Sequence, residues 1–237
     1  MFDLHFHSIA SDWKNSGEEI INDAYEKKLQ FIALTDHDVI SSNDFIDDAQ
    51  KIGIESCYST EISARDLKNK KSLHLTCYSR SFWKNIRDIL ENTVEKKQLL
   101  IIKQIEKLKN LWFKIELNDF LNYFLTIWKK LETLNRFNIW QYLFLNTENI
   151  ILAQKISWKL DINPQSFFEM FLKEVWEHYQ IYWLKYWIDV PEYEPNIEVC
   201  SLLAKTNNAI ISIAHPNKSN KKEGLEYFKK IYPYYVE

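Results

Sequence analysis

Residues 2–8 read FDLHFHS: a short apolar run of strand character leads directly into two histidines, His5 and His7. In an extended segment, side chains two positions apart leave the same face, so both imidazoles can bind one ion. A lone His-x-His pair is a weak motif, and a surface pair is the alternative interpretation. The rest of the chain decides between the two.

A second stretch has the same arrangement. Residues 31–38 read FIALTDHD, in which a short apolar run again ends at polar residues. Between the two runs, Ser16 and Glu19 have the spacing of a capping box and predict a helix to about residue 29. Strand, helix and strand within about 35 residues indicate a β-α-β unit, and therefore an α/β fold.

The middle of the chain has a different periodicity. From Trp83 to Leu111 apolar residues recur at helical spacing, with Lys and Glu between them, and helical patterns continue to about residue 186. Shorter patterns predict a helix over residues 43–51 and strands over 73–78 and 209–213.

These patterns predict a domain organisation. Residues 1–80 and 191–237 are expected to form one α/β domain, and residues 81–190 a mostly helical insertion. Two separate domains are the alternative, which is disfavoured because the stretch after Pro195 is too short to fold alone.

Histidines and carboxylates fall at or after the predicted strands. They are His5 and His7, then Asp36, His37 and Asp38, then Glu61 after a short segment at 56–59, and His215 after the last strand. In α/β barrels the loops after the carboxyl ends of strands form the active-site face, so these side chains are expected at one rim. Imidazole and carboxylate ligands suit Zn, Mn or Fe, and together with Asp12 they predict a metal centre. His74 lies inside an apolar strand pattern, where a core histidine is the usual interpretation, and His178 lies in an aromatic helical stretch and is interpreted as structural.

The composition excludes several classes of protein. No apolar run approaches the ~20 residues of a membrane span, and no secretory signal is recognisable. Three widely spaced cysteines argue against a disulfide framework and fit a reducing cytoplasm. The net charge of −3 lacks the basic excess of proteins that bind long nucleic acids, but it leaves a nucleotide or a strand end as substrate. We therefore expect a cytoplasmic protein with no membrane partner and no stable protein partner.

Several motifs together resemble those of the PHP family, named for polymerase and histidinol phosphatase. Its D-L-H-x-H-S motif followed by S-D is matched at residues 3–8 and 11–12, and its T-D-H-D motif at residues 35–38. Its G-x-E-I-S motif reads STEIS at residues 59–63. Its strand histidine resembles His74, and its A-H-P motif is matched by Ala214, His215 and Pro216. The order and spacing match along most of the chain, so the combination is highly specific.

The resemblance implies a fold and a set of ligands. The fold would be a distorted, seven-stranded (β/α) barrel of PHP type with up to three divalent metal ions at its rim, Mn being expected and Zn or Fe being alternatives. In the mechanism that we expect, Asp36 or Asp38 orients the ligating histidines. The implied ligands are His5, His7 and Glu61 for the first metal, Glu61 as a bridge with His74 and His215 for the second, and Asp12 and His37 for the third.

Two family motifs are altered in this chain. The last family motif, a D-x-H after a further strand, is absent, which predicts either a barrel truncated on its C-terminal side or an incomplete site. An R-x-H motif in the insertion reads Arg136-Phe137-Asn138. Arg136 is expected to bind a phosphate, whereas the role of the histidine is lost or supplied elsewhere.

Glycine is scarce and tryptophan abundant. The chain has three glycines and nine tryptophans, against an average glycine content near 7%. Trp13 stands where the family's S-D-G has glycine, and Trp112, Trp140 and Trp183 fall where small residues would be natural. One hypothesis is that the source organism reads UGA as glycine, and that the translation printed tryptophan. The alternative is a genuinely tryptophan-rich protein.

The resulting function is a metal-dependent phosphoric ester hydrolase. Its substrate is expected to be a small phosphorylated molecule, either a nucleotide or an RNA 5′ end, as in the exoribonuclease and nucleoside bisphosphate phosphatase branch that the helical insertion resembles. A histidinol-phosphatase-like enzyme for a small metabolite is one alternative. A noncatalytic, metal-stabilised binding module is another, and the missing D-x-H motif and Asn138 favour it.

Overall fold

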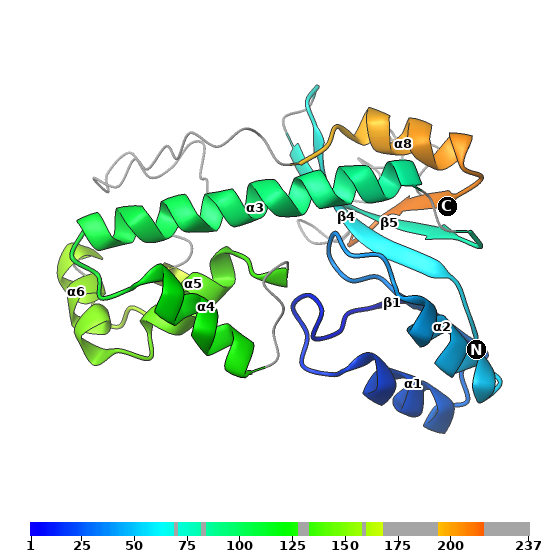
Figure 1. Ribbon diagram of the computed structural model, residues 1–237, viewed down its shortest axis with the longest axis horizontal. Coiled ribbons are helices and arrows are strands. Elements are labelled where there is room, and N and C mark those ends of the chain that lie inside the picture. The colour runs from blue at the N-terminus through cyan, green and yellow to red at the C-terminus, as the bar shows by residue number, and fades with distance from the viewer. Residues whose placement is uncertain (69–70, 82–83, 128–132, 158–159, 168–193, 216–237) are drawn as a thin grey trace. The chain divides into compact units, whose positions relative to one another are not determined.

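The computed structural model describes residues 1–68, 71–81, 84–127, 133–157, 160–167 and 194–215 (Figure 1). The chain divides into two compact units, each considered by itself. Unit 1 comprises Met1–Val94 and Glu192–Glu237, and unit 2 comprises Glu95–Pro191. The assignment of residues 81–190 to a separate inserted domain stays a prediction. Among the described helices, none combines the length and the apolar character of a transmembrane segment.

Unit 1 begins with the predicted β-α-β unit, which is confirmed. Strand β1 (Phe2–Phe6), helix α1 (Gly17–Glu26) and strand β2 (Phe31–Leu34) are followed by helix α2 (Asn43–Lys51) and strand β3 (Glu55–Ser56). The three strands form a parallel sheet in the order β1-β2-β3. The expected capping box opens α1, where the Ser16 hydroxyl accepts from the Glu19 amide and the Glu19 carboxylate accepts from the Ser16 amide. Apolar side chains of α1, α2, β2 and Ile54 form one buried core.

A second sheet in unit 1 is antiparallel. Strands β4 (Tyr58–Asp66) and β5 (Lys71–Ser79) pair along their whole length, as Figure 1 shows, and β6 (Ile210–Ile213) pairs with β5. Helix α8 (Ile197–Thr206) and the start of helix α3 (Lys84–Asn110) pack on this sheet through Ile86, Leu90 and Cys200. An isolated parallel bridge between His37 and Glu61 joins the end of β2 to β4.

The strand pattern differs from a regular (β/α) barrel. The described residues contain six strands in two sheets, and a closed seven-stranded barrel is not seen among them. Only four residues separate β4 from β5, whereas a parallel crossover needs about a dozen or more, so the two strands must form a hairpin. Glu61 also lies inside β4, not after a strand as the sequence suggested.

Unit 2 is helical in its described part. After α3 it contains α4 (Leu117–Thr126), α5 (Arg136–Leu143), α6 (Thr147–Ser157) and the short α7 (Pro164–Phe167). Its core is rich in aromatic side chains, including the fully buried Phe120, Phe124 and Phe167. These rings meet edge to face, as between Phe120 and Phe124 and between Phe113 and Phe167.

Trp112 has a backbone conformation that favours glycine. It follows α3 with φ of 71° and an 85% exposed side chain. The Phe113 amide donates to the Leu108 carbonyl and the Trp112 amide to the Lys109 carbonyl, which is the Schellman pattern. Helix α2 ends with the same two bonds, and there the equivalent position is Gly53 with φ of 83°. The geometry at residue 112 therefore agrees with the glycine hypothesis, and the identity of the residue stays a prediction.

The other three positions of that hypothesis are less informative. Trp13 is 59% exposed, so its large side chain can be accommodated without steric clashes and does not distinguish tryptophan from glycine. Trp140 has a buried indole nitrogen without a hydrogen-bond partner among the described residues, an unfavourable arrangement for a native tryptophan. Trp183 lies outside the described residues.

Replacing Trp112 by glycine is expected to stabilise the protein by about 1 kcal/mol, because an L-residue with positive φ costs roughly 1–2 kcal/mol. For a chain of this size the melting temperature should rise by about 2–4 °C, measurable by thermal unfolding. Gly53→Ala is the matched control, since it places a side chain at φ of 83° and should destabilise by a similar amount. A Trp112→Gly protein that melts below the parent would contradict the assigned strain.

Candidate metal centre

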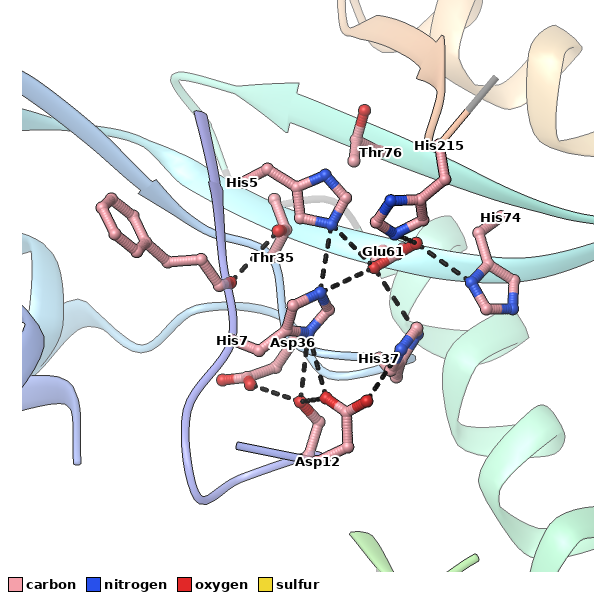
Figure 2. Close-up of polar contacts among 12 residues, drawn as sticks. His5, His7, Asp12, Thr35, Asp36, His37, Glu61, His74, Thr76 and His215 are labelled. Carbon is pink, nitrogen blue, oxygen red and sulfur yellow. Dashed lines mark hydrogen bonds and ion pairs between the residues drawn. The ribbon is translucent and has the colours of Figure 1, made fainter. Parts of the chain in front are cut away.

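A fully buried carboxylate lies at the centre of the site. Glu61 projects from β4 with 0% exposure. Its Oε2 atom lies 3.0 Å from His5 Nε2 and 2.9 Å from His7 Nε2, and its Oε1 atom lies 3.0 Å from His74 Nδ1 and 3.4 Å from His215 Nε2. Figure 2 shows the rings pointing toward this carboxylate from several directions. Each Glu61 oxygen therefore faces its own pair of imidazoles.

His37 extends this cluster toward Asp12. Its Nδ1 atom lies 3.7 Å from Glu61 Oε2, and its Nε2 atom lies 3.6 Å from Asp12 Oδ2. The other Asp12 oxygen lies 3.5 Å from His7 Nδ1. Five of the six histidines of the chain thus surround one glutamate, with a half-exposed aspartate beside them.

The strands account for this convergence. His5 and His7 lie at the end of β1 and directly after it, and their rings share one side as the spacing predicted. Backbone bonds join the loop after β2 to β4: the Asp38 amide donates to the Glu61 carbonyl at 2.8 Å, and the Glu61 amide donates to the Asp36 carbonyl at 3.1 Å.

The remaining two histidines come from the antiparallel sheet. His74 lies on β5, opposite Ser63 of the adjacent strand β4, and His215 follows β6 with φ of 51°. The Ala214 amide donates to the His74 carbonyl at 2.8 Å, which holds the two histidine-bearing segments side by side. The β4–β5 hairpin and β6 therefore place His74 and His215 beside Glu61. The sequence had suggested that the ends of parallel strands would form the site.

Two buried aspartates brace the loops around the site. Asp36 is 2% exposed and accepts hydrogen bonds from Ser8 and Ser11. Asp38 is also 2% exposed and accepts from the amide and the hydroxyl of Ser63, at 2.8 Å each. The sequence singled out both aspartates as groups that orient ligating histidines, and that role stays a prediction. Ser8, Ser11 and Ser63 were not identified from the sequence, although all three lie within the matched motifs.

The charges of the site reinforce one another. Burial alone raises the pKa of Glu61, but hydrogen bonds from His5, His7 and His74 outweigh it and hold the pKa far below its usual range. The interaction with His37 lowers the pKa of Asp12 to about 2. Burial opposes protonation of His7, yet the hydrogen bond and charge of Glu61 raise its pKa. Both carboxylates are therefore anionic near neutral pH.

The donor set fits divalent cations. Three groups of side chains have ligand atoms within 4.8 Å of one another: His5, His7, Glu61 and His215; His7, Asp12 and His37; and His37, Glu61 and His74. The Nε2 atoms of His5 and His7 face each other at 3.0 Å, a contact in which at most one nitrogen can donate. The Nδ1 atom of His37 is buried without a hydrogen-bond partner among the described residues. Lone pairs that converge in this way suit Zn, Mn or Fe.

Three other residues from the sequence argument belong to unit 2 or lie outside the described residues. Arg136 opens α5 in unit 2, so its expected contact with a phosphate stays a prediction. Asn138 is 1% exposed and closes the capping box of the same helix by accepting from the Asn135 amide, which is a structural role. His178 lies outside the described residues.

Comparison with known proteins agrees with this geometry. A family model for the PHP domain matches residues 3–152. A curated 5′-3′ exoribonuclease of Haemophilus influenzae is 43% identical over 63 residues, a match that spans 26% of this chain and 23% of that protein.

Two solved structures have a similar fold. A metal-dependent phosphoesterase of Bifidobacterium adolescentis superposes with a TM-score of 0.65 at 20% identity, over 97% of this chain and 73% of that one. An amidohydrolase of Chromobacterium violaceum, solved with sulfate and without metal, superposes with a TM-score of 0.66 at 17% identity, over 98% of this chain and 73% of that one. At these identities the two structures establish similarity of fold.

Proposed function

Because the chain belongs to the PHP domain family, we propose that it is a metal-dependent phosphoesterase that hydrolyses a phosphate ester of a nucleotide or a short RNA. The observation that carries the proposal is Glu61, a buried carboxylate surrounded by five imidazoles. The proposal includes the seven-stranded barrel that the motifs imply, whereas the described residues contain six strands in two sheets.

The ligand assignment follows the two oxygens of Glu61. Oε2 with His5 and His7 would hold one cation, and Oε1 with His74 and His215 would hold a second, so the carboxylate would bridge them. The ring distances also allow His215 to bind the first cation. Its ring centroid lies 4.7 Å from that of His5 and 6.5 Å from that of His74. A third cation would be held by Asp12 and His37, which meet at 3.6 Å.

The chemistry then divides between the cations and the chain. When bound, divalent cations neutralise the charge of the phosphate and activate water. The chain holds their ligands at fixed positions, because Glu61 is fully buried and Asp36 and Asp38 tie the adjacent loops to the sheets. Arg136 is proposed to bind a phosphate of the substrate through its guanidinium group.

The substrate class rests on weaker support. The short match to a 5′-3′ exoribonuclease favours RNA as the substrate. A nucleoside bisphosphate is the small-molecule alternative, from the family branch that the helical insertion resembles. The net charge of −3 fits a small substrate better than a long duplex, because neutralisation of many phosphates requires a basic surface.

The test is a turnover assay with Mn²⁺. We expect release of phosphate or nitrophenol from an aryl phosphate, faster release of nucleotide from a short 5′-phosphorylated RNA, and no release after treatment with EDTA. Protein stripped by EDTA and then reloaded with Mn²⁺ is the control for irreversible damage. A metal-loaded protein that turns over none of these substrates would contradict the proposed activity.

A further inference from the structure

The ring nitrogen of His7 that points away from Glu61 has a specific partner. His7 Nε2 faces Glu61, and its Nδ1 atom lies 3.3 Å from the hydroxyl of Ser11. The competing acceptor, Asp12 Oδ1, is slightly farther from Nδ1, at 3.5 Å. Because an imidazole that binds a cation through one nitrogen carries its proton on the other, the partner of Nδ1 determines how His7 can serve as a ligand.

The hydroxyl of Ser11 has one proton, and Asp36 is its strongest acceptor. The distance from Ser11 Oγ to Asp36 Oδ1 is 2.6 Å, against 3.3 Å to Asp12 Oδ1. A short O–H···O⁻ bond of this length is charge-assisted and stronger than the longer one. Since the proton goes to Asp36, the Ser11 oxygen is left as an acceptor for the Nδ1–H group of His7.

Asp36 itself is held firmly. Its Oδ1 also accepts from the Ser8 amide at 2.7 Å, and its Oδ2 accepts from the Ser8 hydroxyl at 2.7 Å. The side chains of Ser8, Ser11 and Asp36 are all at most 3% exposed, so water competes little for these bonds. The loop that carries His7 and Asp12 is therefore attached to the end of β2 through a carboxylate with three donors.

We infer that Ser11 and Asp36 act as a positioning pair for His7, which presents its Nε2 lone pair to the Glu61 cluster and keeps Nδ1 as a hydrogen-bond donor. His7 belongs to two of the three candidate ligand groups. Because the pair directs Nε2 of His7 toward Glu61, His7 would bind a cation together with His5 and Glu61. Asp12 and His37 would then bind a separate cation. The inference rests on the proposed metal-binding role of His7.

The test measures binding of Zn²⁺ alone, by competition titration, in the full chain. Ser11→Ala should bind about 10–100-fold more weakly than the parent, as expected when the hydrogen-bond partner of a ligating histidine is lost. Ser11→Thr retains the hydroxyl and should restore most of the affinity. Nitrogen-15 NMR of the Zn²⁺-loaded protein should show a protected Nδ1–H signal for His7 that exchanges rapidly with water in Ser11→Ala.

The matched control is Ser41→Ala. Ser41 is also a buried serine of unit 1, but its hydroxyl donates to the Cys57 carbonyl and accepts from the Ser59 amide instead of bonding a histidine, so its loss should leave Zn²⁺ affinity close to that of the parent. Equal affinity in Ser11→Ala and the parent, or an equal loss in Ser11→Thr, would overturn the inference while leaving the proposed function intact. A parent protein that binds neither Zn²⁺ nor Mn²⁺ would instead refute the proposed function.

Discussion

Replacing Glu61 by glutamine is expected to abolish high-affinity metal binding and to lower phosphoesterase activity by more than about 100-fold, since loss of a mere supporting partner already costs 10–100-fold. The carboxylate supplies an anionic oxygen to each of two histidine pairs. Glutamine has nearly the same shape but carries no charge, and its amide nitrogen cannot donate a lone pair to a cation. The metal content of the purified protein, by elemental analysis, and the rate of turnover with Mn²⁺ are the two measurements.

The matched control for this variant is Glu55→Gln. Glu55 lies on β3 with an exposed side chain, so the same change in composition and net charge should leave both metal content and turnover close to the parent. Retention of stoichiometric metal by Glu61→Gln would show that the five imidazoles bind the cations without the carboxylate, and would remove the central support of the proposed mechanism.

Much of this site could be predicted from the sequence, because its chemistry is local to short motifs. The spacing of His5 and His7 on an extended segment put both rings on one side, and the ring centroids lie 5.0 Å apart. The capping box at Ser16 and the apolar run before Thr35 predicted the β-α-β unit that places His37 near His7. The resemblance to the PHP family, carried by these motifs, is confirmed by the family match.

The environment of Glu61 could not be predicted in the same way. Strand β4 reads YSTEISARD, and five of its polar residues are buried, so the alternation of apolar and polar residues that marks a strand is missing. These buried groups are satisfied by bonds to other segments: Ser59 donates to the Leu34 carbonyl, and Ser63 donates to Asp38. Because those partners are distant in the chain, sequence periodicity gives no indication of them.

The hydrogen bonds that hold the histidine-bearing loops could not be predicted from the sequence, for a related reason. Asp36 and Asp38 were recognisable as polar residues after a strand, but the acceptor role of Asp36 depends on a loop folding back from residues 8–11. Arg136 belongs to unit 2 and the histidines of the site to unit 1, so its role in phosphate binding has to be tested by experiment.

Removal of metal is expected to lower the melting temperature of the parent protein by about 5–15 °C. The ligands converge only in the folded chain, so a cation binds the native state and stabilises it by about 2.7 kcal/mol at a free concentration of 100 Kd and about 4.1 kcal/mol at 1,000 Kd. Each kcal/mol shifts the melting temperature of a chain of this length by about 2–4 °C. Thermal unfolding with EDTA and with Mn²⁺ measures the difference, and Glu61→Gln, which lacks the central ligand, should show no shift.

Hydrogen exchange with and without metal can show which segments the cation stabilises. All candidate ligands lie in unit 1, and the described residues of unit 2 after α3 contribute none of them. Hydrogen exchange with and without Mn²⁺ should therefore show added protection in the loop after β1, in the loop after β2 and along β4 and β5, while α4 to α6 change little. The helices of unit 2 serve as the internal control. A melting temperature that is indifferent to EDTA, or unchanged exchange in the loops after β1 and β2 and along β4 and β5, would contradict a metal centre built around Glu61.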